Sequence, residues 1–221
     1  CDTSNIKHIK KIISDTKTNE IDIGYKLGLE FFYSKNGRKF LSKIKNHKIF
    51  LDLKLNDIPN TCAASIKSLK DLKNIKYLTC HVSGGLDMML KIKKTAKKIN
   101  KDLKILGVTI LTSFSEQGIK KVGYTKKIKD LVIKQTKLAK LAKLDGVVCS
   151  GFEAKKIKKI SKKMEIITPG IRLPGHSAQD QIRIMTPKQA FANGATAIVM
   201  GRSIINGNIK KNIQKLIKSL N

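Results

Sequence analysis

Residues 49–61 read Ile-Phe-Leu-Asp-Leu-Lys-Leu-Asn-Asp-Ile-Pro-Asn-Thr, and their apolar pattern predicts a β-strand that carries the motif Asp-x-Lys-x-x-Asp. Because side chains alternate along a strand, the apolar residues at the odd positions face one side, and Asp52 and Lys54 share the other. If the sheet closes into a barrel, this polar side is the interior, where an ion pair is costly to desolvate. We therefore expect the two charges to serve the protein's function.

Short apolar runs alternate along the chain with longer amphipathic stretches, in which apolar residues recur three and four positions apart. This alternation predicts parallel strands joined by crossover helices. The expected strands are residues 21–25, 49–53, 77–82, 103–110, 144–149, 165–168 and 196–200. The clearest helical patterns are residues 3–19, 61–72, 88–99, 128–142 and 204–220.

This order of elements predicts one α/β domain over residues 1–221 with the (β/α)₈ TIM-barrel fold, whose active site lies at the carboxyl ends of the strands. Since residues 3–19 read as a helix, we expect the first strand of the barrel to end just upstream of Cys1. Polar or glycine-containing segments follow nearly every apolar run, in agreement with a site at this edge. A doubly wound open sheet is the alternative architecture, but the chain has no G-x-G-x-x-G turn to favour it.

The formal net charge of +30 at pH 7 raises the hypothesis of a basic nucleic-acid-binding protein. However, only four of the 46 basic residues are arginines, and the lysines are spread over most helical segments. Nucleic-acid surfaces usually combine arginine with interleaved aromatic residues, which make up only 5% of this chain. We expect solvated lysines and no bound nucleic acid, although the excess charge can attract an anionic substrate.

The cysteines and histidines do not have the spacing of a metal site. The four widely spaced cysteines lack C-x-x-C pairing and indicate reduced thiols in a cytoplasmic protein. No apolar run approaches the ~20 residues that span a membrane. We expect no metal and no cofactor, and we expect His81, at a strand end, either to line the site or to be structural. The residues concerned are Cys1, Cys62, Cys80, Cys149, His8, His47, His81 and His176.

Two arginines follow the last two apolar runs, and barrels commonly bind phosphate around their last two strands. Arg172 ends the stretch Thr-Pro-Gly-Ile-Arg, and Arg202 follows Gly201 where a strand runs into a helix. Glycine lets the backbone approach a ligand, the helix start offers unpaired N–H groups, and arginine adds a charged fork. The two stretches together predict a phosphate site, over which the polar loop after Arg172 can fold.

Lys26 and Asp57 extend the charged set in different ways. Lys26 follows the run 21–25 with the parity that points into the barrel. Asp57 lies past its strand, has the opposite parity to Asp52, and stands in a turn closed by a proline. It need not reach the interior of its own barrel, so a neighbouring subunit can receive it.

In this order, the motifs resemble the orotidine 5′-phosphate decarboxylase family. The family signature Asp-x-Lys-x-x-Asp-Ile-Pro-Asn-Thr is matched from Asp52 to Thr61, and the resemblance covers essentially the whole chain. The Asp-x-Lys-x-x-Asp motif alone is shared with related phosphosugar lyases. The other matching stretches are residues 25–28, 81–85, 111–113, 145–150, 168–172, 180–183 and 201–203.

The resemblance implies a homodimer that decarboxylates orotidine 5′-phosphate to UMP, the last step of de novo pyrimidine synthesis, without a cofactor. It implies a charge array of Lys26, Asp52, Lys54 and the Asp57 of a second subunit beneath the pyrimidine, with Lys54 as the proton donor to C6. The implied substrate-binding residues include Asp52 and, for the ribose, Asp2, Lys26 and the second subunit's Thr61; for the pyrimidine, Thr112 and Ser113; for the phosphate, Arg172, Gln181, Gly201 and Arg202.

Two other functions stay open at this point. The first is a Mg²⁺-dependent phosphosugar lyase of the same superfamily, such as 3-keto-gulonate-phosphate decarboxylase or hexulose-phosphate synthase. The second is the basic nucleic-acid-binding protein considered above. Insensitivity to EDTA would argue against the first function, and the absence of salt-sensitive duplex binding would argue against the second.

Overall fold

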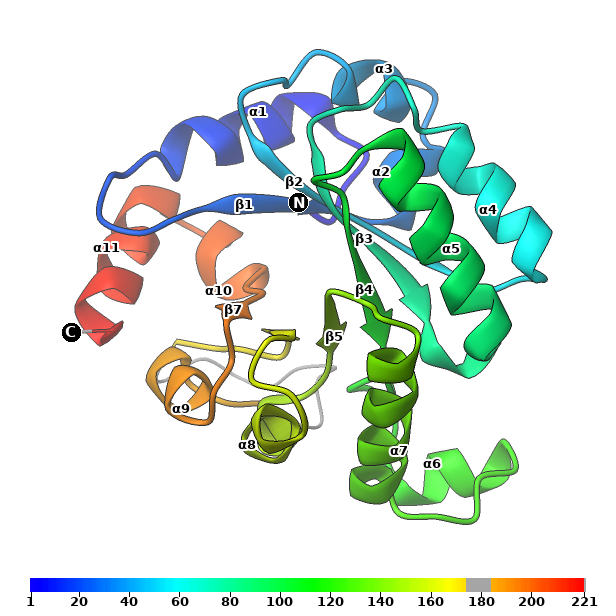
Figure 1. Cartoon of the computed structure of the whole chain (residues 1–221). Coiled ribbons are helices and arrows are strands. Elements are labelled where there is room, and N and C mark those ends of the chain that lie inside the picture. The colour runs from blue at the N-terminus through cyan, green and yellow to red at the C-terminus, as the bar shows by residue number, and fades with distance from the viewer. Residues whose placement is uncertain (174–183, 221) are drawn as a thin grey trace.

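The computed structural model describes residues 1–173 and 184–220, and the strands in this part of the chain form one parallel sheet in sequence order (Figure 1). Each strand pairs in parallel with the next, as predicted for a (β/α) barrel. The strands are β1 (Gly24–Leu27), β2 (Lys48–Leu55), β3 (Ile75–His81), β4 (Lys104–Val108), β5 (Gly146–Val148), β6 (Glu165–Thr168) and β7 (Ala197–Ile198).

The sheet curls, and within the described residues β1 and β7 are its two edges. The amine of Cys1 donates a hydrogen bond of 2.9 Å to the backbone oxygen of Lys26, so the first residues lie beside β1 (Figure 1). The strand that we expect upstream of Cys1 would precede the sequence and stays a prediction.

Helices surround the outer face of the sheet (Figure 1). Their ends carry recognisable signals: Asn5 caps α1 by accepting from the His8 amide, and Pro59 opens α4. The helices are α1 (Ile6–Asp15), α2 (Leu29–Tyr33), α3 (Gly37–Leu41), α4 (Pro59–Lys67), α5 (Leu86–Ile99), α6 (Glu116–Lys121), α7 (Ile128–Leu141), α8 (Gly151–Ile160), α9 (Pro187–Ala192), α10 (Arg202–Ile205), α11 (Ile209–Leu220) and the 3₁₀ helix η1 (Val82–Gly84). No helix of the described ranges is long and apolar enough to cross a membrane.

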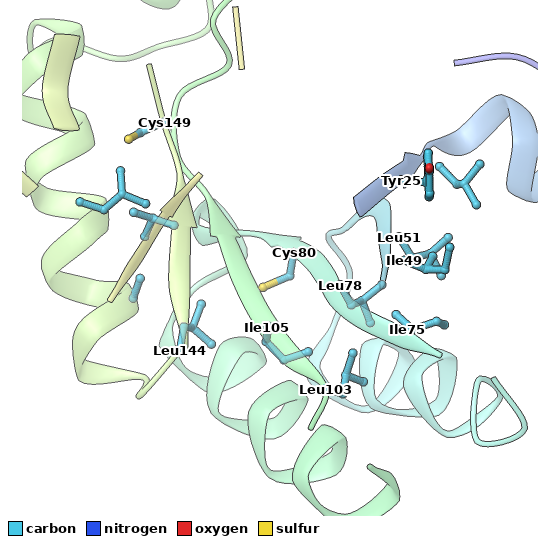
Figure 2. Packing of buried hydrophobic residues seen from close by; sticks show 14 of the residues in the cluster. Tyr25, Ile49, Leu51, Ile75, Leu78, Cys80, Leu103, Ile105, Leu144 and Cys149 are labelled. Atoms are coloured by element: carbon cyan, nitrogen blue, oxygen red, sulfur yellow. The ribbon is translucent and has the colours of Figure 1, made fainter. Parts of the chain in front are cut away.

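The core has two layers, one on each face of the sheet. The larger layer packs between strands and helices, where Leu51, Leu78 and Ile105 are fully or almost fully buried (Figure 2). The smaller layer fills the inside of the curl with Phe50 and Leu106, among others. Since strand residues alternate, Asp52 follows Phe50 on the inner side, directly above this apolar layer.

Most predicted elements begin or end a few residues away from their observed bounds, and two of these differences have a clear cause. The first strand begins at Gly24, because Gly24 pairs with the first residue of β2 and the backbone pairing of the two strands starts there. The helix predicted over residues 204–220 is broken between α10 and α11 at Gly207, whose φ is +74°. Asn212 stabilises the break, because its side chain donates to the backbone oxygens of Ile204 (3.0 Å) and Asn206 (2.8 Å).

Candidate active site

Three charged side chains from two neighbouring strands meet inside the curl of the sheet. The Asp52 carboxylate on β2 accepts from Lys54 Nζ at 2.8 Å and from Lys26 Nζ of β1 at 3.1 Å, both at the same oxygen, Oδ2. Asp52 is only 7% exposed, whereas the two lysine side chains keep about 30% of their surface in contact with solvent. The alternation along β2 therefore correctly predicts that Asp52 and Lys54 lie on one face of the sheet. The two lysine side chains are more exposed to solvent than the carboxylate between them.

The pKa of Asp52 follows from this environment. Burial favours the neutral acid and acts to raise the pKa, but the charges of Lys26 and Lys54 oppose it. Hydrogen bonds from Lys54 and Thr79 add to the lysine charges, and together they hold the pKa of Asp52 below its ordinary value. Asp52 is therefore a carboxylate near neutral pH.

Thr79 is a member of this site that the sequence-based set omits. Its buried hydroxyl donates to Asp52 Oδ1 at 2.8 Å and accepts from the backbone amide of Lys54 at 2.9 Å. The sequence contains a sign of its position: Thr79 shares strand parity with His81, and its strand is the next one along the chain after the Asp-x-Lys motif. An isolated threonine in a β-strand is common, so this parity alone did not single it out.

The end of β2 departs from regular strand geometry at Lys54. Its φ is +50°, and Lys54 and Lys143 are the two non-glycine residues with positive φ among those the structure describes. Positive φ is uncommon for residues with a Cβ and is enriched at functional sites. Lys54 thus forms its ion pair with Asp52 from a backbone conformation that a regular β-strand does not have.

His81 ends β3 beside the charged set. Burial, and next the positive charge of Lys54, lower its pKa, while the charge of Asp52 acts in the opposite direction. The neutral imidazole is therefore favoured here. The two sequence-based readings, a residue that lines the site and a structural histidine, both remain compatible with this position.

Arg172 lies just past β6 and is held by the backbone on both sides. Its amide donates to Met185 O at 3.0 Å, and the Met185 amide donates to Gly170 O at 3.2 Å. The guanidinium Nη1 donates to Ile171 O at 3.0 Å, and the residue is 7% exposed. The arginine predicted to bind phosphate is therefore fixed at the carboxyl end of the sheet, where the other charged side chains lie.

Gly201 and Arg202 join β7 to α10, also at the carboxyl end of the sheet. Among the described residues, no atom lies within 4 Å of the position that a Cβ on Gly201 would take. Arg202 is half-buried at the first position of the helix. The structure thus brings the glycine and the arginine to the same edge of the sheet, while Gln181, the remaining residue of the predicted phosphate set, lies outside the described residues.

The residues expected to contact the sugar and the base lie on separate segments after the strands. Asp2 is exposed, and its Oδ1 lies 3.4 Å from the position that a Cβ on Gly28 would take, at the end of β1. Thr112 is half-buried and Ser113 is exposed, both between β4 and α6. All three residues are at the carboxyl edge of the sheet, as a barrel active site requires.

Asp57 and Thr61 do not join the charged set within one chain. Asp57 is exposed, and its Oδ1 accepts from the amide of Ile58 at 2.7 Å, but it forms no ion pair with the residues described. Thr61 is exposed on α4, and Ile58 between them is 67% exposed. A single barrel leaves both residues on its surface, which is the position that the parity of Asp57 predicts.

Residues 1–173 and 184–220 contain no group of three or more His, Cys, Asp or Glu side chains arranged to hold a metal ion. Cys62 and Cys80 are buried thiols, and burial raises the pKa of both, that of Cys80 to about 12. These cysteines are therefore protonated and unreactive near neutral pH.

A family model described as the orotidine 5′-phosphate decarboxylase / HUMPS family matches residues 1–215. Among curated relatives, a protein of Wolbachia sp. subsp. Brugia malayi (strain TRS), named orotidine 5′-phosphate decarboxylase, is 44% identical and is covered to 86% by an alignment that spans 88% of this chain. A protein of the same name from Buchnera aphidicola subsp. Acyrthosiphon pisum (strain Tuc7) is 38% identical, with 98% of both chains covered.

Solved structures give the same picture. The crystal structure of orotidine 5′-phosphate decarboxylase from Lactobacillus acidophilus superposes with a TM-score of 0.86 and 33% identity, covering 100% of this chain and 96% of that one. The structure of orotidine 5′-monophosphate decarboxylase from Methanocaldococcus jannaschii, complexed with the inhibitor BMP, gives a TM-score of 0.76 over 100% of this chain and 96% of the other. The second match is 22% identical, so it supports the fold alone.

Proposed function

The chain belongs to the orotidine 5′-phosphate decarboxylase / HUMPS family and decarboxylates orotidine 5′-phosphate to UMP, and from this premise we propose that Lys54 is the proton donor. The observation that carries the proposal is the position of the Lys54 ammonium. It lies 2.8 Å from the buried carboxylate of Asp52, inside the curl of the sheet, and the lysine side chain is 31% exposed to solvent. The phosphosugar lyase and the nucleic-acid-binding protein are not favoured, because the 38–44% identical relatives bear the decarboxylase name.

The reaction needs a cation next to C6, the carbon on which negative charge develops. The bond between C6 and the carboxylate breaks, its electron pair stays on C6, and carbon dioxide leaves. Lys54 then transfers one ammonium proton to C6, giving UMP, and regains a proton from solvent. Because the negative charge on C6 exists only along the reaction path, an ammonium fixed at that position stabilises the transition state more than the substrate.

Asp52 and Lys26 prepare Lys54 for this step. Asp52 holds the ammonium of Lys54 in place through an ion pair at 2.8 Å. Lys26 balances the charge of Asp52 from the neighbouring strand at 3.1 Å. With both lysines on one carboxylate oxygen, the array carries alternating charges into the space that the pyrimidine would occupy.

The phosphate and the sugar take the rest of the carboxyl edge. We assign the 5′-phosphate to Arg172, Gly201, Arg202 and Gln181, and the ribose to Asp2 and Lys26. Thr112 and Ser113 border the pyrimidine. The phosphate binds away from C6, so its binding energy can be used to orient the base and exclude water at the reacting carbon.

A homodimer completes the site in this proposal. The exposed Asp57 and Thr61 would enter the active site of a second subunit, where Asp57 adds the fourth charge beside Lys54 and Thr61 adds a ribose contact. The support is that Asp57, Ile58 and Thr61 are exposed together on the edge where the site lies. We also place the enzyme in the cytoplasm, in keeping with its buried thiols Cys62 and Cys80.

The loss of orotidylate absorbance, followed with purified protein, tests the assignment of Lys54. Lys54→Ala removes the proton donor, and we expect turnover to fall by at least about 10³-fold, since a general acid and its charge together contribute on this order. Lys11→Ala, which removes a lysine paired with Asp15 on the surface of α1, is the matched control and should keep full activity. Turnover should persist in EDTA. Turnover retained by Lys54→Ala would contradict the role given to this residue.

A further inference from the structure

The hydroxyl of Thr79 contacts the side chain of Asp52 and the backbone of Lys54 at the same time. It donates to Asp52 Oδ1 at 2.8 Å and accepts from the backbone amide of Lys54 at 2.9 Å. Thr79 is 0% exposed, and the two lysine ammonium groups bind the other oxygen of the carboxylate, Oδ2. A single buried hydroxyl therefore links the carboxylate that orients Lys54 to the backbone that carries Lys54.

The pairing of β2 with β3 shows why this link is needed. Leu51 pairs with Leu78 and Leu55 pairs with Cys80, so four steps along β2 face two steps along β3. Such extra residues form a bulge, whose amides lose their regular ladder partners. Thr79 is the one β3 residue opposite this bulge, and its side chain takes the place of a backbone acceptor for the Lys54 amide.

We propose that Thr79 is a positioning residue for the decarboxylation, which fixes the Asp52 carboxylate and the bulged backbone of Lys54 so that the ammonium stays aimed at C6. This inference rests on the proposed function of Lys54, and Thr79 itself touches no reacting atom. In this proposal the hydroxyl of Thr79 supports catalysis, in addition to the packing role that any threonine in a strand can have.

The division of the carboxylate explains how the hydroxyl acts. Thr79 occupies Oδ1, and both lysines bind Oδ2, so each oxygen has a distinct set of partners. The terminal torsion of an aspartate is otherwise broad and roughly two-fold, so without Thr79 the carboxylate can turn and offer the lysines either oxygen. Lys54 would then lose both its backbone anchor and a fixed counter-ion.

Two substitutions separate the hydroxyl from the shape of the side chain. Thr79→Val keeps the branched volume and removes the hydroxyl, whereas Thr79→Ser keeps the hydroxyl. We expect Thr79→Val to lower kcat by about 10- to 100-fold with KM for orotidylate changed less than about 3-fold, and Thr79→Ser to recover most of kcat. Thr136→Val is the matched control, because Thr136 is also 0% exposed and its hydroxyl donates to Val132 O within its own helix, α7.

Two further measurements distinguish positioning from stability alone. Since the Thr79 bond lowers the pKa of Asp52, its loss should move the acidic limb of the kcat/KM profile of Thr79→Val to higher pH. Hydrogen exchange should show the Lys54 amide protected in the wild type and in Thr79→Ser, and exposed to exchange in Thr79→Val. The exchange measurement needs no turnover, so it tests the link even if the proposed reaction of Lys54 is wrong.

The possible failures have different signatures. If wild-type protein shows no turnover, or if Lys54→Ala keeps it, the proposed function fails, and a protected Lys54 amide that Thr79→Val exposes would still support the anchor. If the wild type is active and Thr79→Val keeps kcat within about 2-fold, positioning is overturned. It is equally overturned if Thr136→Val loses as much kcat as Thr79→Val, or if Thr79→Ser fails to restore it.

Discussion

The ionisation of Asp52 links the charge of the site to the stability of the fold. Its pKa is lowered relative to the ordinary value of 3.8, so the folded protein binds this proton less readily than the unfolded chain does. A carboxyl group of this kind stabilises the fold at pH values above its unfolded pKa, and the contribution is lost as the pH falls through the folded pKa. The ion pairs with Lys26 and Lys54 are therefore strongest near neutral pH.

Replacing Asp52 by asparagine should make this dependence visible. We expect Asp52→Asn to reduce the free energy of unfolding at pH 7 by about 1–3 kcal/mol, because two partly buried lysines lose their counter-ion. The difference from the wild type should begin to shrink as the pH falls below about 4, because the unfolded wild-type chain then takes up a proton that folded Asp52 binds less readily. Urea denaturation of Asp52→Asn and of the wild type between pH 3 and pH 7 measures the two free energies of unfolding and the way their difference changes with pH.

The control for this prediction is Asp71→Asn, which breaks an exposed ion pair with Arg38. Pairs of this kind contribute less than about 1 kcal/mol, so this variant should stay close to the wild type throughout. A loss for Asp52→Asn that is the same at pH 3 and pH 7 would contradict the linkage to its ionisation.

At the scale of elements, the short helix α10 carries Arg202 and depends on α11 for its position. Asn212 of α11 donates to the backbone oxygens of Ile204 and Asn206 and is 8% exposed. These bonds satisfy the carbonyls left open where Gly207 breaks the helix. The proposed phosphate end of the site is thus anchored by one amide that does not itself face the ligand.

Asn212→Ala should raise KM for orotidylate by about 3- to 30-fold and leave kcat near the wild-type value, because it loosens α10 but leaves Lys54 in place. Asn74→Ala is the matched control. Asn74 also donates to two backbone oxygens, those of Leu41 (3.0 Å) and Ile44 (3.1 Å), but it directly precedes β3 and lies away from the carboxyl edge. Steady-state kinetics and thermal unfolding of both variants compare the two effects; equal changes in KM would argue against the anchor.

The contrast between Asp52 and its neighbours shows what the sequence can predict. Alternation on β2 is a local property, so it predicts that Asp52 and Lys54 share a face. The bulge, the positive φ of Lys54 and the role of Thr79 depend on pairing with β3, which is a non-local property. The break at Gly207 escapes prediction for a different reason, since apolar residues keep a helical spacing on both sides of it.

For the whole molecule, one barrel leaves Asp57 and Thr61 outside its own charge array. Their exposure next to Ile58, which is 67% exposed, agrees with a contact between two copies of the chain at the carboxyl edge. In a symmetric dimer each copy would give Asp57 to the other, so each active site would need residues from both chains. This arrangement stays a proposal, which parity on β2 and the exposure of Asp57 support, and it can be tested by mixing subunits.

Lys54→Ala and Asp57→Ala subunits should each be nearly inactive alone, and mixing them should restore activity. In a hybrid dimer one site contains both substitutions, while the other contains an intact Lys54 and the intact Asp57 of its neighbour. Mixing Lys54→Ala with Asp52→Ala is the control, because both residues act within one chain, so every hybrid site is damaged and no activity should return. Orotidylate turnover after unfolding and joint refolding measures both mixtures. If the first mixture recovers no more activity than the second although hybrids form, Asp57 does not act across the dimer.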